Sequence, residues 1–181
     1  MPEQLHFTDS EEANELIARD PMALLVGFAL DQQVTVQKAF VGPLAIQERI
    51  GALDAQTLAD ADLDAVFRQK PAVHRYPGAM AKRVKELAAH LLEEYDGDAE
   101  RVWRDAADAG ELRANLAALP GFGDMKVKSL AAVLAKQYGV KAAEPLVPNH
   151  PTLGDVKSAN DLADYQAAKR IHKQEWNKVV V

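Results

Sequence analysis

The sequence predicts an all-α protein. Alanine, leucine, aspartate, glutamate and lysine outnumber the β-branched residues, which is a composition that favours helices. Apolar residues also recur at helical spacing, most clearly over 79–95, where Val84, Leu87 and Leu91 fall on one face. A chain of 181 residues can bury a substantial core. No internal repeat or low-complexity tract divides it.

Three helices are expected in the first fifty residues. A capping signal at the start of 8–19 begins the first helix. Pro21 opens the second, over 22–31, which is strongly apolar and expected to be buried. The third extends over 36–49, and the Gly-Pro pair at 42–43 is expected to kink or split it.

The middle of the chain alternates short and long helical segments. Residues 54–69 indicate one or two short helices, and 70–78 is a loop with two prolines. The strongest amphipathic helix of the chain follows over 79–95, and a short helix is expected over 100–107.

The last third begins with two helices joined by a short turn, a hairpin over 111–138. Periodicity then fails over 141–159, which holds three prolines and is expected to be a loop. Ser158 can cap a final helix, from Asp161 to about Trp176.

Composition excludes several kinds of site. The sequence contains no cysteine, so disulfides, thiolate zinc sites and an iron–sulfur cluster are ruled out. The histidines show no metal-ligand spacing with carboxylates, and no metal site is expected. No apolar run reaches membrane-spanning length and no signal peptide is recognisable, so we expect a cytoplasmic protein without a membrane partner.

The net charge of −6 argues against a general nucleic-acid binder, but the basic residues are clustered. Two of the clusters flank the hairpin in the sequence, and each alone is typical of a solvated helix face. The three clusters are Lys82, Arg83 and Lys85; Lys126, Lys128 and Lys136; and Lys169, Arg170, Lys173 and Lys178.

The most informative segment is Leu119-Pro-Gly-Phe-Gly-Asp-Met-Lys126, which joins the two helices of the hairpin. Gly121 and Gly123 permit positive φ and leave backbone N–H groups bare at the start of the second helix. Such a turn can hold a phosphate through amides and the helix dipole alone. This is the pattern of a helix-hairpin-helix, a sequence-independent clamp on the DNA backbone. A simple linker between two helices often contains the same proline and glycine residues.

Three segments, in this order, resemble the helix-hairpin-helix DNA glycosylase superfamily, which includes endonuclease III and adenine glycosylase. They are the apolar helix that leads into two glutamines (24–33), Tyr76-Pro-Gly-Ala-Met-Ala-Lys-Arg83, and the hairpin itself. The likeness covers roughly 22–140. Within the superfamily, the chain most resembles a small bacterial branch that lacks the iron–sulfur cluster. It implies one domain, 1–181, of two helical lobes with double-stranded DNA across the cleft and a nucleotide rotated into a pocket.

The resemblance also implies roles for individual residues. Amides of the hairpin turn would hold backbone phosphate, often with a bound monovalent cation, and nearby cations would add a salt-sensitive contribution. A glutamine would fill the gap left by the flipped base, although helix capping explains the glutamines almost as well. The implied DNA-binding residues are Gln32, Gln33, Lys82, Arg83, Leu119, Pro120, Gly121, Phe122, Gly123, Lys126 and Lys128.

Glycosidic cleavage needs a carboxylate to stabilise the oxocarbenium character of the sugar. In the family it stands about two dozen residues past the hairpin, in a Val-Asp-Thr-His-like string. The matching string here is Val147-Pro-Asn-His150, which places Pro148 or Asn149 at the aspartate position. Glu144 and Asp155 are the replacement candidates, and Asp155 is preferred because it precedes the last helix. Either could instead be a solvated loop carboxylate.

Lyase activity is not expected. Bifunctional members carry a Schiff-base lysine where this chain has Met125, and Lys126 is rotated from that position by about 100° on a helix. Three functions therefore stay open: a monofunctional DNA glycosylase, a catalytically inactive DNA-binding or lesion-sensing protein, and a helical interaction module. A monomer without a tightly bound cofactor is expected, and the sequence does not identify the base.

Overall fold

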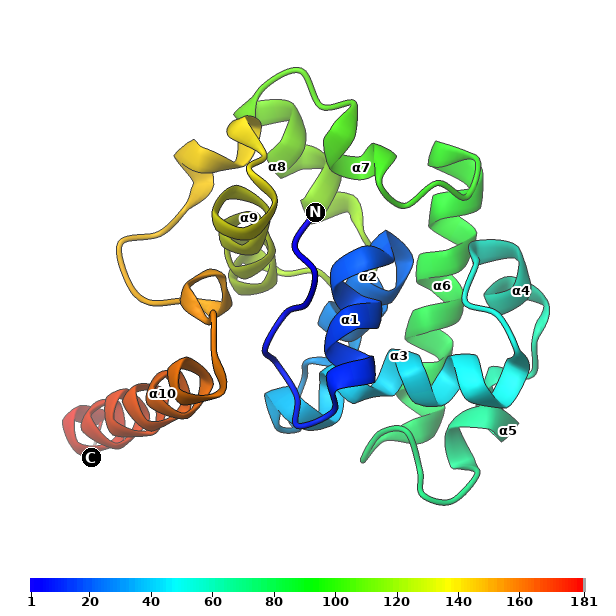
Figure 1. Cartoon of the computed structure of the whole chain (residues 1–181), viewed down its shortest axis with the longest axis horizontal. Coiled ribbons are helices and arrows are strands. Elements are labelled where there is room, and N and C mark those ends of the chain that lie inside the picture. The colour runs from blue at the N-terminus through cyan, green and yellow to red at the C-terminus, as the bar shows by residue number, and fades with distance from the viewer. Residues whose placement is uncertain (181) are drawn as a thin grey trace.

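A computed structural model, described over residues 1–180, is helical throughout and has no strand in that range (Figure 1). The all-α prediction is confirmed. The α-helices are α1 (Glu11–Arg19), α2 (Pro21–Leu30), α3 (Val36–Ile50), α4 (Ala55–Asp60), α5 (Leu63–Arg68), α6 (Pro77–Tyr95), α7 (Arg101–Arg104), α8 (Ala109–Ala118), α9 (Asp124–Tyr138) and α10 (Ala159–Val180). Two 3₁₀-helices, η1 (Lys141–Leu146) and η2 (Leu153–Asp155), lie between α9 and α10.

Helix α2 is the centre of the first half of the molecule. Every residue from Met22 to Leu30 is buried, as the sequence predicts. Two glycines bring α2 and α3 together, because a side chain on Gly27 would overlap Phe40 and one on Gly42 would overlap Leu30. Helices α1, α3 and α6 all contact α2, so the end of α2 is held firmly in place (Figure 1).

Helix α3 continues through Gly42-Pro43, so of the kink or split expected there the split does not occur. A proline inside a helix costs about 3 kcal/mol through a lost hydrogen bond and a steric clash. Burial of Phe40, Leu44 and Ile46 from the same helix offsets that cost, because each of them packs into the core.

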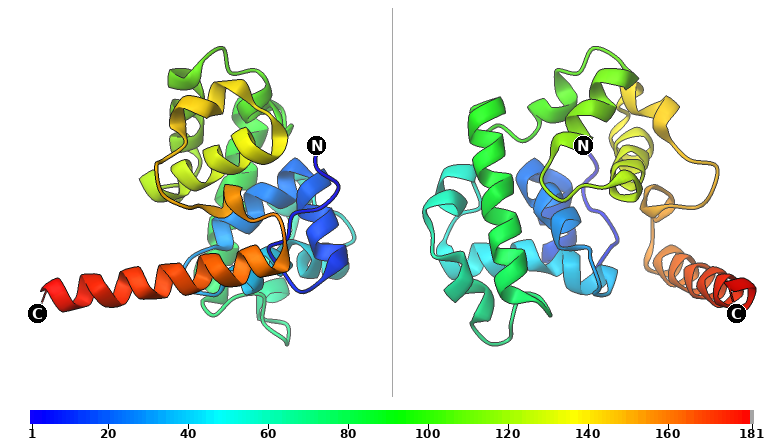
Figure 2. Two further views of the ribbon diagram at one scale, coloured as in Figure 1. Left: turned by 60° about the vertical axis from the view of Figure 1, so that its left-hand side comes forward. Right: turned by 180° about the vertical axis from the view of Figure 1, so that it is seen from behind.

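The segment 141–159 was expected to be a loop, but it contains η1 and η2, both packed on α9. Helix α10 is also longer than expected, although Ser158 caps it as predicted through the N–H of Asp161 (3.1 Å). Beyond a reciprocal pair of hydrogen bonds between Gln37 and Gln166, α10 projects away from the other helices (Figure 2). Over 1–180, no helix combines the length and apolarity needed to cross a membrane.

Side-chain caps begin most of the helices, but α6, α7 and α9 lack them. Ser10, Asp20, Thr35, Asp54, Asp62 and Asp108 accept hydrogen bonds from the first turns of α1, α2, α3, α4, α5 and α8. Helix α9 begins at Gly123 without such a bond. Its first N–H groups are therefore left for another partner.

Candidate nucleic-acid interface

The turn between α8 and α9 is a tight, anchored reversal. The N–H of Phe122 donates to the carbonyl of Leu119 at 3.0 Å, and Gly121 adopts a φ of 80°. Proline at the second position and glycine with positive φ at the third are the signature of a type II turn. Leu119 and Phe122 are buried, so the apolar side chains fix the turn while Gly121 and Gly123 stay exposed.

The start of α9 provides an anion-binding geometry. Gly123 has extended backbone (φ −79°, ψ 179°), and its carbonyl accepts the first helical hydrogen bond from Val127 at 3.0 Å. The N–H groups of residues 124–126 precede that bond and have no carbonyl within the helix to reach. Together with the helix dipole, they favour a negatively charged group at this point.

Arg83 of α6 brings a cation to the same turn. Its guanidinium lies where a side chain on Gly121 would project, so only glycine leaves room for it. The Arg83 side chain is 29% exposed and reaches no closer than 4.0 Å to Glu86, which leaves most of its donors unsatisfied by that pair. Lys82, one residue earlier, is 80% exposed. The sequence placed both cations beside the hairpin, and the structure brings Arg83 into contact with it.

Lys126 does not point outward from the turn, as a phosphate ligand would. Its ammonium donates to the carbonyl of Ala29 at 3.1 Å, at the end of α2, and lies 5.7 Å from the centre of the Phe122 ring. Burial lowers the pKa of Lys126. The negative charge of Asp31 acts to raise this pKa, and the positive charge of Arg83 lowers it further. The side chain thus connects the hairpin to α2, where a cation offsets the helix dipole.

Asp31 is a site residue that sequence reasoning missed. It follows α2 directly and is half-buried, and burial raises its pKa, while the charges of Lys169 and Lys126 favour its ionised form. Its carboxylate is therefore close enough to Lys126 of α9 and Lys169 of α10 for both charges to act on its ionisation. Its position immediately before the Gln32-Gln33 pair was the available signal, because the neighbours of a candidate inserting side chain are candidates too.

The two glutamines lie in a constrained turn after α2. The N–H of Gln32 donates to the carbonyl of Leu30 at 2.8 Å, and Asp31 between them has φ −75° and ψ 71°, an inverse γ-turn. Gln33 adopts a φ of 57°, which is rare for a residue with a side chain. Both glutamine side chains are exposed, so they project from the molecule on the side of Asp31.

The outer flank of the hairpin carries an ion-pair cluster. Lys128 lies 3.0 Å from Asp124, and Arg113 of α8 lies 3.9 Å from the same carboxylate. All three line a shallow hollow with Val127, Pro145 and Leu146. An acidic side chain therefore stands at the first position of α9, where a phosphate would also bind.

The two carboxylates named from the sequence lie on the 3₁₀-helices η1 and η2. Asp155 closes a capping box in η2 by accepting from the N–H of Thr152 at 2.9 Å, and it pairs with Lys136. Partial burial acts to raise its pKa, but the hydrogen bonds from Lys136 and Thr152 lower it overall. Lys136 and Lys126 are ten residues apart on α9, about 15 Å along the axis. Glu144 is exposed on η1.

No protein-family model, curated protein or solved structure matches this chain. The geometry described above therefore carries the functional argument together with the motif order.

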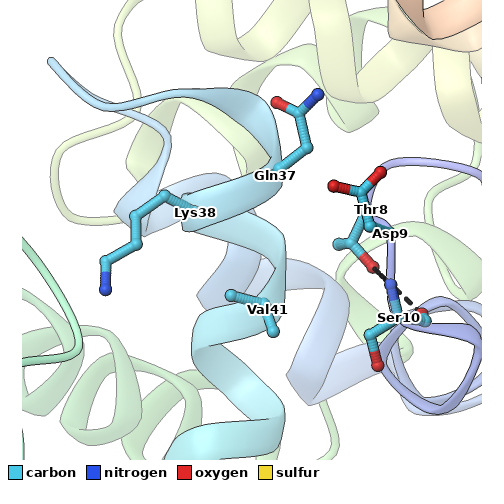
Figure 3. Close-up of a pocket in the computed structure, with 6 residues that line it drawn as sticks. All are labelled: Thr8, Asp9, Ser10, Gln37, Lys38 and Val41. Carbon is cyan, nitrogen blue, oxygen red and sulfur yellow. Dashed lines mark hydrogen bonds between the residues drawn. The ribbon is translucent and has the colours of Figure 1, made fainter. Parts of the chain in front are cut away.

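Two other features offer less chemistry. A hollow between the N-terminal segment and α3 is lined by Thr8, Asp9, Ser10, Gln37, Lys38 and Val41 (Figure 3). The hydroxyl of Thr8 is already engaged there, since it accepts from the N–H of Ser10 at 2.9 Å. Within the described part of the chain, histidine and carboxylate side chains form no group able to hold a metal ion.

Proposed function

We propose that this protein is a monofunctional DNA glycosylase of base-excision repair, which breaks the N-glycosidic bond of a flipped damaged or mispaired base. The observation that carries the proposal is the turn at Gly121–Gly123, where the uncapped start of α9 and the guanidinium of Arg83 meet. The resemblance of three segments, in the right order, to the helix-hairpin-helix glycosylases supports it independently.

Binding would begin at the DNA backbone. A phosphate at the turn would accept from the free N–H groups of α9, with Arg83 beside it and Lys82 and Lys128 nearby. These cations are few, so the salt dependence of binding should be modest, with a slope near one unit per phosphate neutralised. A local cluster of this kind is compatible with the acidic total charge.

Base displacement would use the turn after α2. Gln32 and Gln33 are exposed on an ordered segment, so one of them can occupy the stack where the target nucleotide was. Asp31 directly precedes them. Its carboxylate would therefore lie close to the sugar of the extruded nucleotide.

The chemistry requires an anion beside the sugar. As the glycosidic bond breaks, its electron pair leaves with the base and C1′ gains positive charge, which an ionised Asp31 would stabilise. The same carboxylate can accept a proton from the water that adds to C1′. Lys126 would remain a cation bonded to Ala29, so its nitrogen would not attack the sugar. This arrangement supports hydrolysis without lyase chemistry.

The second candidate is a DNA-binding or lesion-sensing protein without catalysis. The observation that favours it is the engagement of Asp155 by Lys136 and Thr152, which leaves that carboxylate in a structural role. In that case the clamp and the glutamines would serve recognition alone.

A single-turnover assay distinguishes the two. The protein is incubated with duplexes that each hold one lesion (uracil, 8-oxoguanine, an alkylated purine or a mismatch), alkali reveals abasic sites, and fluorescence anisotropy reports binding. We expect salt-sensitive binding of all duplexes and alkali-labile sites in at least one. Binding without strand breaks in any lesion duplex would favour the non-catalytic function, and absence of binding would contradict both.

A further inference from the structure

His74 is a buried histidine with both ring nitrogens engaged. Its side chain belongs to the loop before α6 and is 2% exposed. Nδ1 accepts from the N–H of Tyr76 at 2.9 Å, which requires the ring proton to be on Nε2. Nε2 lies 3.0 Å from the carbonyl of Leu30 and 3.1 Å from that of Gln32, so it donates to both ends of one turn.

The turn that His74 holds is the one that presents the glutamines. Leu30 and Gln32 are the ends of the inverse γ-turn around Asp31, and Gln33 follows with positive φ. A side-chain-bearing residue in that conformation is disfavoured and persists only where its surroundings impose it. In the described structure, His74 is the side chain that bonds to this turn from outside α2 and its own segment.

The loop that carries His74 is itself fixed to α3. Lys38 donates to the carbonyl of Ala72 at 2.6 Å, and Arg49 donates to the carbonyls of Gln69 and Pro71 at 2.9 and 2.6 Å. The ring is therefore a fixed support, since three hydrogen bonds from α3 hold the backbone that precedes it.

We propose that His74 is a positioning residue, which holds Asp31, Gln32 and Gln33 in the conformation that engages DNA. This inference rests on the proposed function for the DNA step alone, because the hydrogen bonds define the restraint without it. The geometry also requires a neutral imidazole, because a proton on Nδ1 would face the N–H of Tyr76.

Several groups surround the ring. Burial lowers the pKa of His74, and the charges of Lys38 from α3 and Lys126 from α9 lower it further. The hydrogen bonds to the carbonyls of Leu30 and Gln32 act to raise the pKa, but the net shift is downward. Arg75 and Tyr76 adjoin it on its own segment, where the guanidinium lies over the tyrosine ring at 5.3 Å. Protonation of the imidazole should therefore remove the acceptor for the N–H of Tyr76, while Nε2 still donates to the glutamine turn.

The test compares His74→Leu with His74→Gln, because a glutamine amide has an acceptor and a donor spaced as in the imidazole. His90→Leu is the matched control, since the Nε2 atom of His90 is buried without a partner. Amide hydrogen exchange of Gln32 measures the restraint directly. We expect exchange to be about tenfold faster in His74→Leu, because a change of that size corresponds to the loss of one buried hydrogen bond. In His74→Gln we expect the slower exchange to recover in part. Wild-type exchange in both His74 variants would overturn the proposal.

A second readout concerns DNA. Affinity for a duplex with a tetrahydrofuran abasic-site analogue is divided by affinity for the intact duplex, which separates gap filling from backbone binding. We expect this ratio to fall several-fold in His74→Leu and in Gln33→Ala, recover in His74→Gln, and stay unchanged in His90→Leu. An unchanged ratio in His74→Leu would refute the DNA step. If wild-type protein binds neither duplex, the proposed function fails, and Gln32 exchange alone decides whether His74 restrains the turn.

Discussion

The guanidinium of Arg83 fills the space beside Gly121 that any other residue at 121 would need for its side chain. Residue 121 also has a φ of 80°, so the backbone favours glycine there, and a side chain would in addition displace the guanidinium. The contact joins α6 to the hairpin across 38 positions of sequence. A cation from one segment and free N–H groups from another thus meet at a single point.

The two glycines of the turn should respond differently to alanine. Gly121→Ala imposes a disfavoured φ and displaces Arg83, so we expect a loss of about 2–3 kcal/mol in the free energy of unfolding and loss of duplex binding. Gly123→Ala has φ −79° and nothing within 4 Å of its new Cβ, so its loss should stay below about 1 kcal/mol. Denaturant unfolding measures both, and equal losses would contradict the assigned turn.

Asp124 should oppose DNA binding. Asp124→Asn releases Lys128 and removes a negative charge from the phosphate position, so we expect duplex affinity to rise about two- to fivefold, the effect of one exposed pair. Asp64→Asn is the control, because Asp64 pairs with Arg68 at similar exposure but on α5. Anisotropy titrations at several salt concentrations measure the difference. A weaker affinity in Asp124→Asn would show that the carboxylate helps to build the site.

Stability should decrease on mild acidification because of His74. Its folded-state pKa lies below the ordinary value of 6.5, so the unfolded chain takes up a proton first as the pH falls. This contribution is full above pH 6.5 and is lost as the pH falls from there to the folded-state pKa, at up to about 1.4 kcal/mol per pH unit. Unfolding free energies of wild type and His74→Gln, measured from pH 7.5 to 5, should differ in their pH slope by up to that amount, with the steeper loss in the wild type. Parallel curves would mean that His74 titrates normally.

Lys126 should act as a structural cation rather than a nucleophile. Borohydride added to wild-type protein with an abasic-site duplex should trap no covalent adduct, because the amine is bonded to Ala29. Lys126→Met should lower the free energy of unfolding by about 1–2 kcal/mol by leaving that carbonyl unpaired. The exposed Lys128→Met should change it by less than about 0.5 kcal/mol. A trapped adduct that disappears in Lys126→Met would reverse the assignment.

The local features of this molecule could be predicted from the sequence. Helical periodicity located the long helices, and Pro-Gly-Phe-Gly located the hairpin, because both depend on neighbouring residues. The capping box of η2 was also readable, since Thr152 and Asp155 have its spacing. That spacing indicates a structural role for Asp155, which the family analogy obscured.

The contacts that assemble the site could not be predicted. Lys126 reaches Ala29 across 97 residues, and His74 reaches Leu30 across 44. Such pairs depend on how α2, α9 and the loop before α6 pack together, which no local pattern specifies. The same packing brings Asp31 close enough to Lys126 and Lys169 for their charges to act on its ionisation.

If Asp31 supplies the anion for glycosidic cleavage, single-turnover base release should distinguish Asp31→Asn from Asp155→Asn. The assay uses whichever lesion duplex the wild-type protein cleaves, with duplex affinity measured in parallel. We expect Asp31→Asn to bind DNA but lose at least about a hundredfold in rate, as when one charge-stabilising group is removed. Asp155→Asn should keep the wild-type rate and lose only stability. Base release that survives in Asp31→Asn and disappears in Asp155→Asn would contradict the account.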